Sequence, residues 1–267
     1  MKLHFRKEGQ GSPLVIVHGL YGSSDNWVVI SKKLAEKYTV YSVDLRNHGL
    51  SPHHPEHTYL AMKDDLAGFF EEHHIGPAVI LGHSMGGKTA ILFAADFPEK
   101  TEKLIVVDIA PKDYLELESE SQYHLHRTIL LAMMEVNFSR VKTRQDVEDV
   151  LAEKIDNPRI RQFLLKNVTP DKTSHRLKWK LNVEALYNHL EEIVQGGNYR
   201  KFLDRIPITA YPVVFIRGLE SNYIMDEDIK LIKSIYPDAN IVDIPQAGHW
   251  LHAEQPERFL EAVLQCC

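Results

Sequence analysis

The sequence predicts an α/β protein with a mostly parallel sheet, flanked by helices and interrupted by an inserted helical segment. Three observations support this class. Short runs rich in β-branched residues alternate with amphipathic stretches, several of these runs are apolar throughout, and the alternation stops between residues 111 and 206. Continuous apolar runs are typical of strands that are covered on both faces. Strands that alternate with helices imply right-handed crossovers between parallel strands.

Six segments predict strands because they are short and rich in β-branched residues. They are residues 14–17, 39–43, 78–81, 104–107, 213–216 and 240–244. The spacing of apolar residues predicts helices between these strands. The helices cover residues 27–38, 59–73 and 88–94, and a last one begins near Gln255 and Pro256.

Between Pro111 and Ile206 the sequence has four helix-like segments and no obvious strand. A helical block between the strands of a parallel sheet predicts a lid over the carboxyl ends of the strands, where such sheets bind ligands. We expect residues 1–110 and 207–267 to form the core and residues 111–206 to form the lid. The four segments are residues 116–134, a helix capped by Thr143, a helix that begins at Asn157-Pro158, and residues 181–194, which stop at Gly196-Gly197.

Composition and charge narrow the class of partner. The 267 residues are 44% hydrophobic and 25% charged, as in ordinary globular proteins. A net charge of −6 at pH 7 argues against nucleic acid as the main partner. No apolar run approaches the roughly 20 residues that cross a membrane, and residues 1–8 carry charges where a signal peptide needs an apolar stretch. We expect a cytoplasmic protein without a membrane span.

The cysteines and histidines do not predict a metal site. Cys266 and Cys267 are adjacent, so they cannot join distant segments, and they lack the spacing of a zinc site. The paired histidines lack the spacing with glutamate that zinc enzymes use. These pairs are His53-His54, His73-His74 and His124/His126.

The segment Gly82-His83-Ser84-Met85-Gly86 lies between the strand predicted over 78–81 and the helix predicted over 88–94. The pattern Gly-x-Ser-x-Gly at such a junction predicts a nucleophile elbow. Because the turn is very sharp, side chains two positions before and after the serine would collide with the backbone. The turn exposes the serine hydroxyl and directs the amides at the start of the helix toward the group that it attacks. The alternative is a glycine-rich turn that only joins a strand to a helix.

A serine hydroxyl is a poor nucleophile near neutral pH, so it needs a base in contact and a partner that orients the base. Of the 15 histidines, His249 is the candidate base. It follows the strand predicted over 240–244 and precedes the last helix, which places it at the same sheet edge as Ser84. The alternative is a surface histidine without a catalytic role.

The acid is less obvious from the sequence. In the commonest arrangement it follows the strand after the lid, but that position, counted from Gly218, is Ser221. Asp108 ends the strand predicted over 104–107, which follows the strand that carries the serine, so its carboxylate emerges at the same edge. We therefore expect Asp108 to orient His249, with Glu220 as the second candidate and Asp226 as the third.

Two backbone amides are needed to stabilise the negative charge of the oxyanion. Met85 follows the nucleophile and supplies one, and Leu20 in the loop after the strand 14–17 is the candidate for the second. Gly19 lets that loop pass close to the serine, and we expect His18 to fix the loop by hydrogen bonds. We expect the segment 44–51 to be a polar loop that holds strand ends together.

Over nearly its full length the chain resembles the α/β-hydrolase superfamily. The landmarks are His18-Gly19, the segment 44–51, the Ser84 elbow and Gly248-His249. Within it, Val107-Asp108-Ile109-Ala110-Pro111 and the segment 218–223 resemble a bacterial branch of small serine esterases, in which the triad acid follows the sixth strand and a four-helix lid covers the site.

The resemblance implies hydrolysis of carboxylic esters, with acyl-CoA thioesters as a further substrate class, and no cofactor. It carries the triad over as Ser84, Asp108 and His249. The usual acid after the lid is missing here, so the assignment of Asp108 depends on the branch.

We therefore predict acyl transfer on a small-molecule ester or thioester by a monomer or homodimer. A serine at the elbow argues against epoxide hydrolases and haloalkane dehalogenases, which need a carboxylate there. Hydrolysis of a C–C bond in a diketone, a lyase step in quinone synthesis and a non-catalytic small-molecule receptor stay open as alternatives.

Overall fold

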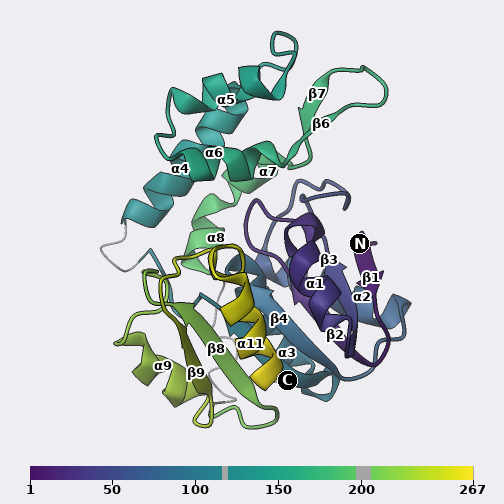
Figure 1. The fold of residues 1–267 in the computed structure, drawn as a ribbon, viewed down its shortest axis with the longest axis vertical. Coiled ribbons are helices and arrows are strands. Elements are labelled where there is room, and N and C mark those ends of the chain that lie inside the picture. The colour runs from purple at the N-terminus through teal and green to yellow at the C-terminus, as the bar shows by residue number, and fades with distance from the viewer. Residues whose placement is uncertain (116–119, 197–205, 267) are drawn as a thin grey trace.

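A seven-stranded sheet with helices on both faces forms the centre of the molecule (Figure 1). The computed structural model describes residues 1–115, 120–196 and 206–266. Predictions that concern residues 116–119, Gly197 and Cys267 therefore lie outside the described residues.

The sheet has the strand order β1-β3-β2-β4-β5-β8-β9. Six of its strands are parallel, and they coincide with the six strands that the sequence predicts. The strands are β1 (Phe5–Glu8), β2 (Ser12–Val17), β3 (Tyr38–Val43), β4 (Ala78–His83), β5 (Thr101–Val107), β8 (Val213–Gly218) and β9 (Asn240–Ile244).

The edge strand β1 was not predicted. It pairs antiparallel with β3, with Phe5 opposite Val43. Its sequence Phe-Arg-Lys-Glu has no apolar run, so the pattern that identifies buried strands is missing. Charged side chains on an edge strand discourage pairing with other chains, which is consistent with exposed Arg6 and Lys7 here.

The two faces of the sheet bury separate hydrophobic clusters. Along β4, Val79 and Leu81 pack with one cluster, which includes Trp27 and Phe259, and Ala78 and Ile80 pack with the other. This alternation follows from the two-residue period of a strand. Helices α1 (Val28–Leu34) and α11 (Pro256–Cys266) cover the first face, and α2 (Tyr59–Glu72), α3 (Met85–Asp96) and α9 (Asp228–Ile235) cover the second. Short helices η1 (Ser24–Trp27), η2 (Pro98–Lys100) and α10 (Leu251–Glu254) complete the core.

Residues 120–196, which we call the α4–α8 segment, form a separate layer beyond the carboxyl ends of the strands (Figure 1). Thr143 and Asn157 cap two of its helices, as predicted. The expected fourth helix is in fact two helices that meet at His189. The elements are α4 (Glu120–Glu135), α5 (Arg144–Ala152), α6 (Pro158–Leu165), β6 (Val168–Pro170), β7 (Leu177–Trp179), α7 (Val183–Asn188) and α8 (Leu190–Gln195).

The hairpin of β6 and β7 corrects the expectation that this segment has no strand. Each of the two strands has three residues, which is too short to show a strand period in the sequence. Asp171 closes the turn, because its carboxylate accepts hydrogen bonds from the amides of Thr173 and Ser174. Such local bonds from aspartate are typical of turns.

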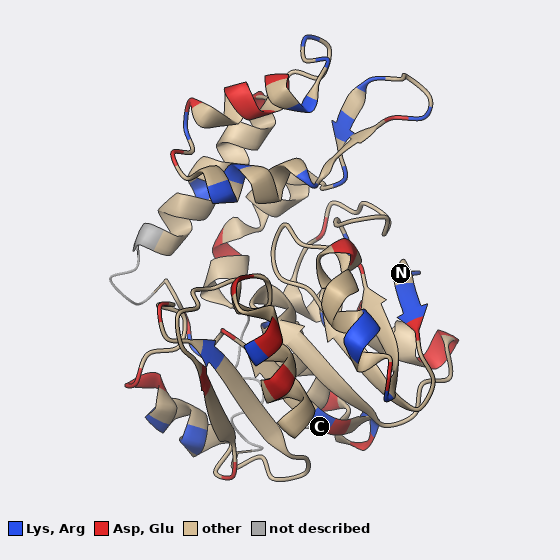
Figure 2. Ribbon diagram, in the orientation of Figure 1, with Lys and Arg blue, Asp and Glu red and all other residues tan. Residues whose placement is uncertain are grey.

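Basic and acidic residues alternate along the ribbon of both layers in the view of Figure 2. Among the described residues, no helix combines the length and the apolar character that crossing a membrane requires.

Candidate active site

Ser84 lies at the junction of β4 and α3 in a strained backbone conformation, with φ 53° and ψ −120°. The neighbouring glycines are required by space. A Cβ on Gly82 would lie 2.4 Å from the carbonyl oxygen of Gly86, and a Cβ on Gly86 would lie 2.3 Å from the carbonyl oxygen of Val17. The Ser84 amide donates to the Val107 carbonyl at 2.9 Å, which ties the turn to β5. The elbow geometry expected from the motif is therefore present.

The loop between β9 and α10 brings His249 to this serine. Its Nε2 lies 3.0 Å from Ser84 Oγ, and its Nδ1 lies 2.7 Å from Asp108 Oδ2. Asp108 directly follows β5 and is fully buried. The structure thus brings the three residues of the predicted triad into one hydrogen-bonded chain. Counted along this chain, β5 is the fifth strand and not the sixth.

The Asp108 carboxylate is held from several sides. Its Oδ1 accepts from the Gly218 amide at 3.1 Å, and its Oδ2 accepts from the hydroxyl of Ser221 as well as from His249. Ser221 occupies the position, counted from Gly218, at which the commonest arrangement places the acid. At this position the chain has the hydroxyl of Ser221, which donates to Asp108, instead of a carboxylate.

The structure does not bring the other two candidate acids to His249. The side chain of Glu220 is exposed, and its amide donates to the Ala247 carbonyl at 2.9 Å. The side chain of Asp226 is 90% exposed and pairs with Arg217 at 2.7 Å.

Two aromatic neighbours of His249 could not be identified from the sequence. Tyr223 stacks on its ring, with ring centroids 3.8 Å apart and planes inclined by 19°. His83 Nε2–H donates to the His249 carbonyl at 2.8 Å. Burial, followed by repulsion from His249 and His252, holds the pKa of His83 well below its usual range, so His83 is a neutral donor. The sequence shows only that His83 precedes the serine in the elbow motif, and this does not indicate a contact with His249.

Leu20 and Met85 line the pocket together with Ser84. In the part of the chain that the structure describes, neither amide donates a hydrogen bond. The Gly19 carbonyl accepts from His18 Nδ1 at 2.8 Å and from the Gly22 amide at 2.9 Å. Because a peptide is planar, fixing that carbonyl also fixes the direction of the Leu20 N–H. His18 therefore has the position of a residue that fixes the loop, as expected.

The approach of this loop to the elbow requires Gly19. A Cβ at this position would lie 2.7 Å from His83 Nδ1 and 3.1 Å from Ser84 Cβ.

The segment 44–51 supports the same loop. Asp44 Oδ1 accepts from the Ser24 amide at 2.6 Å, and Oδ2 accepts from the Leu50 amide at 2.9 Å. His48 Nε2 accepts from the Tyr21 amide at 3.3 Å. These contacts give the segment the structural role that the sequence suggested.

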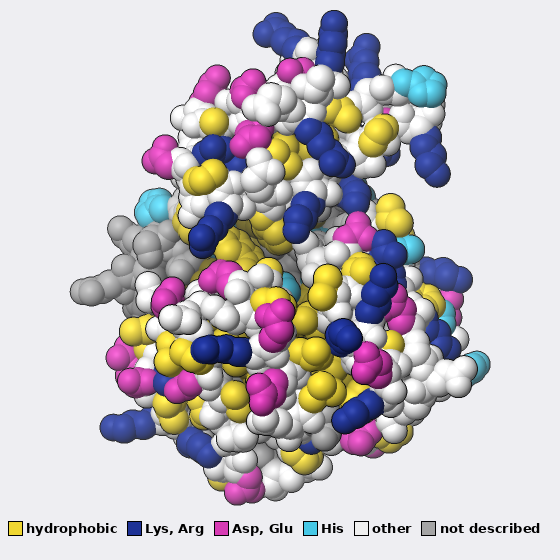
Figure 3. All heavy atoms as spheres, viewed as in Figure 1, with side chains coloured by type: hydrophobic (Ala, Val, Ile, Leu, Met, Phe, Trp, Pro, Cys, Tyr) yellow, Lys and Arg dark blue, Asp and Glu magenta, His cyan; other side chains and the backbone are white. Residues whose placement is uncertain are grey.

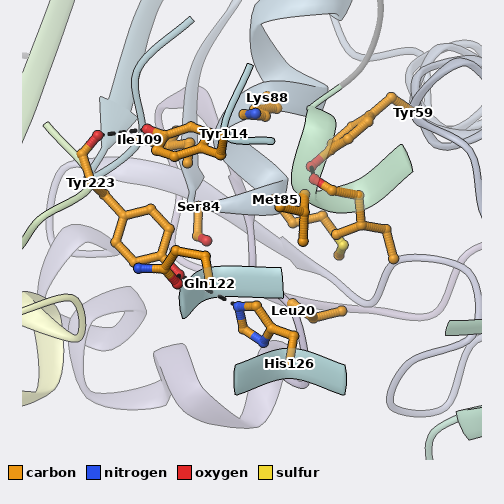
Figure 4. A pocket seen from close by; sticks show the side chains of 12 residues that line it. Leu20, Tyr59, Ser84, Met85, Lys88, Ile109, Tyr114, Gln122, His126 and Tyr223 are labelled. Carbon is orange, nitrogen blue, oxygen red and sulfur yellow. Dashed lines mark hydrogen bonds between the residues drawn. The ribbon is translucent and has the colours of Figure 1, made fainter. Parts of the chain in front are cut away.

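The cavity at Ser84 has two lobes, which share Leu20, Ser84, Gln122, His126 and Tyr223. The inner lobe extends toward α3 and α8, and Figure 4 shows Lys88 and Tyr59 across it from His126. The outer lobe has a volume of about 200 Å³ and lies under α4 and α6. Figure 3 shows hydrophobic side chains in the hollow between the two layers. Residues specific to the inner lobe include Met85, Ile109, Tyr114, Ile193 and Val194, and those specific to the outer lobe include Ile129, Ile160, Phe163, His249 and Trp250.

Lys88 closes the inner lobe from α3, one helical turn beyond Ser84. Its Nζ donates to the carbonyls of Lys112 and Gln195 at 3.1 and 3.5 Å and lies 4.5 Å from the Tyr114 ring centroid. Burial lowers the pKa of Lys88 well below its usual range. No sequence pattern indicates that this amine is buried.

The parallel sheet is covered by helices on both faces and carries a serine at a strand-to-helix elbow, with a histidine and an aspartate on neighbouring loops. This combination is typical of hydrolases with an α/β fold. The chain belongs to the α/β-hydrolase family, because the family model described as alpha/beta hydrolase fold matches residues 12–256. Its relatives place it beside bacterial esterases within that family.

Three relatives illustrate the match. An sn-1-specific diacylglycerol lipase, ABHD11, of Danio rerio is 36% identical over 97% of this chain and 80% of its own length. Esterase YbfF of Escherichia coli is 34% identical over 98% of both chains. A solved structure titled marine microorganism esterase is 43% identical, covers 100% of this chain and 99% of its own, and superposes with a TM-score of 0.93.

Proposed function

We propose that this chain is a serine hydrolase that cleaves carboxylic esters through an acyl-enzyme. In this proposal Ser84 is the nucleophile, His249 the base and Asp108 the residue that orients the base. The observation that carries the proposal is the continuous hydrogen-bonded chain from Ser84 Oγ through the His249 ring to Asp108. Relatives named esterase and lipase support the same class of reaction.

Acylation begins when Ser84 Oγ attacks the carbonyl carbon of the ester and His249 Nε2 takes the hydroxyl proton. Asp108 accepts from Nδ1–H, which fixes the tautomer and stabilises the imidazolium. The carbonyl oxygen becomes an oxyanion, and the amides of Leu20 and Met85 donate to it. Each such donor contributes about 3–4 kcal/mol to stabilisation of the transition state.

Collapse of the tetrahedral intermediate breaks the bond to the alcohol oxygen, which leaves with the proton from His249. His249 lines the outer lobe, so the alcohol takes up its proton and leaves on that side. Water then attacks the acyl-enzyme with His249 as base, which releases the acid and restores Ser84.

We also propose that the core comprises residues 1–110 and 207–267 and that residues 111–206 form the lid. The position of the α4–α8 segment over Ser84, with Gln122 and His126 lining both lobes, supports this division. The apolar walls of the cavity suit small acyl esters. Acyl-CoA thioesters remain a second substrate class to be tested.

A fluorophosphonate probe tests the proposal directly. The wild-type protein should be labelled at Ser84, and Ser84→Ala should abolish both labelling and hydrolysis of p-nitrophenyl esters. Wild-type protein that is neither labelled nor active would instead be a non-catalytic receptor. Labelling without turnover of esters would favour the C–C hydrolase or the lyase. Esters and acyl-CoAs of graded chain length then define the substrate.

The cytoplasmic location and the monomeric or homodimeric state expected from the sequence stay predictions. Cell fractionation tests the location, and light scattering tests the oligomeric state.

A further inference from the structure

Tyr21, the residue after the proposed oxyanion donor Leu20, has a backbone conformation that its surroundings must hold in place. Its φ is 62°, in the left-handed region that residues with large side chains rarely adopt. A conformation of this kind persists where neighbouring contacts determine it. The side chain is also buried, with 4% of the residue exposed. The contacts of Tyr21 therefore decide how residues 18–22, which we call the oxyanion loop, lie beside Ser84.

The backbone of Tyr21 is held once from the core and once from the α4–α8 segment. Its amide donates to His48 Nε2 at 3.3 Å, and its carbonyl accepts from Asn167 Nδ2 at 2.9 Å. Asn167 follows α6 and is 3% exposed. Its own amide donates to the Leu164 carbonyl at 2.9 Å, and its carbonyl accepts from the Lys180 amide at 2.7 Å. The backbone of Asn167 is thus fixed within its own layer, and its side chain reaches the other layer.

The hydroxyl of Tyr21 makes a second contact with the same layer, through α4. It lies 3.3 Å from His126 Nδ1, and His126 Nε2 lies 3.5 Å from the Tyr223 hydroxyl oxygen. Because Tyr223 donates its proton to Gln122 Oε1 at 2.7 Å, its oxygen is left to accept from Nε2–H. Nδ1 is then the acceptor for Tyr21. Burial lowers the pKa of His126 to about 4, so the ring is neutral near pH 7 and can accept in this way.

We propose that the lid positions the oxyanion loop through Tyr21. Asn167 holds the Tyr21 carbonyl and His126 holds its hydroxyl, so the Leu20 N–H is aligned with the ester oxygen while the lid is docked. In this account Asn167 and His126 are positioning residues, and the lid is part of the catalytic arrangement as well as a cover. The inference rests on the proposed function, because it assigns a role to the proposed oxyanion donor.

Asn167→Asp is the most direct variant to test this. It keeps the size of the side chain, removes the donor and places an acceptor against the Tyr21 carbonyl. Asn182→Asp is the matched control, because Asn182 Nδ2 also joins the two layers, by bonds to Asn47 Oδ1 at 3.1 Å and to the His54 carbonyl at 3.2 Å. Asn182 caps α7 through its oxygen, which aspartate retains, and in the described structure its side-chain hydrogen bonds run to residues 47, 54 and 185 rather than to the oxyanion loop.

With p-nitrophenyl acetate as substrate, Asn167→Asp should lower kcat by about 10–100-fold, a part of what loss of a whole oxyanion donor costs. KM should stay close to the wild-type value, because the ground-state contacts are intact. Asn182→Asp should keep the wild-type kcat. A wild-type kcat in Asn167→Asp, or equal losses in both variants, would overturn the proposal.

Tyr21→Phe provides a second measurement that does not depend on a buried carboxylate. It removes the hydroxyl that meets His126, and it should lower kcat while leaving the melting temperature and KM close to wild type. Tyr21→Phe with the wild-type kcat would remove His126 from the proposal. Hydrolysis and Ser84 labelling by the wild-type protein are measured in the same series. Their absence would overturn the proposed function itself, whereas wild-type activity with insensitive variants would overturn this inference alone.

Discussion

At the scale of single residues, the acid of the site departs from the commonest arrangement, in which it follows the strand after the lid. Asp108 reaches His249 from the end of β5, and Ser221, at the end of β8, donates to the same carboxylate. The two strand ends are neighbours in the sheet, so a carboxylate on either one can meet the imidazole. In this chain a hydroxyl follows β8 and the carboxylate follows β5. Because the carboxylate still meets the imidazole, the chemistry of the site is unchanged.

Asp108→Asn tests this assignment. Asparagine keeps the shape of the side chain but cannot stabilise the imidazolium or enforce its tautomer, so kcat on a p-nitrophenyl ester should fall by about 10⁴-fold. Glu220→Gln is the control and should keep near-wild-type kcat, because Glu220 is exposed. If Glu220→Gln loses activity while Asp108→Asn keeps it, the acid is Glu220.

Local signals were sufficient to propose Ser84 and His249 from the sequence, whereas the choice of Asp108 over Glu220 and Asp226 also depended on the resemblance to one esterase branch. Ser84, His249 and Asp108 each follow a run of apolar residues, and ends of parallel strands meet at one edge. Contacts that join remote segments had no such signal. The stacking of Tyr223 on His249 and the bond from Asn167 to Tyr21 depend on how loops and layers pack, which residue spacing does not encode.

At the scale of elements, the helices with capping residues were predicted most accurately. Thr143 accepts from the Asp146 amide at 3.1 Å, and Asp146 Oδ2 accepts from the Thr143 amide at 3.0 Å, so two free amides of α5 are satisfied. In contrast, β1 and the hairpin of β6 and β7 are short and lack an apolar pattern. They form because neighbouring chain offers hydrogen-bond partners, which is a tertiary effect.

Removal of the cap should weaken α5 measurably. Thr143→Ala leaves the Asp146 amide without its side-chain acceptor, so the free energy of unfolding should fall by about 1 kcal/mol. Urea denaturation measures this change. Thr173→Ala is the matched control, because Thr173 is exposed in the β6–β7 turn and uses its backbone amide rather than its side chain there. Equal effects of the two changes would contradict the capping role of Thr143.

At the scale of the whole molecule, the core and the α4–α8 segment both contain buried neutral histidines. Burial is the main cause that lowers the pKa of His57 and His252 to about 3 and that of His126 to about 4, whereas an unfolded chain has histidines near 6.5. Between these values the unfolded state binds protons that the folded state excludes. Stability is therefore fully present above about pH 6.5 and falls as the pH decreases toward the folded pKa values.

The free energy of unfolding should accordingly decrease between pH 7 and pH 5, by up to about 1.4 kcal/mol per pH unit for each such histidine. Urea denaturation at the two pH values measures the slope. His252→Phe keeps an aromatic ring against Trp27. It should reduce the slope of the free energy of unfolding against pH by the contribution of a single histidine. An equal or higher stability at pH 5 would contradict the account.

The fold class and the parallel strands could be predicted because the alternation of apolar runs and helical stretches extends over the core of the chain. The two-lobed cavity could not, because its walls come from α4, α6 and α8 as well as from the sheet. Cavity shape depends on the packing of two layers against each other. Sequence patterns define each layer but not the space between them.

The central claim is that Ser84, His249 and Asp108 act together beside two aligned amides. A crystal structure of the protein after reaction with a fluorophosphonate tests it most directly. We predict phosphorus bonded to Ser84 Oγ, its free oxygen within hydrogen-bond distance of the Leu20 and Met85 amides, and His249 still bonded to Asp108. A phosphonyl group on another residue, or one whose oxygen points away from both amides, would contradict the account.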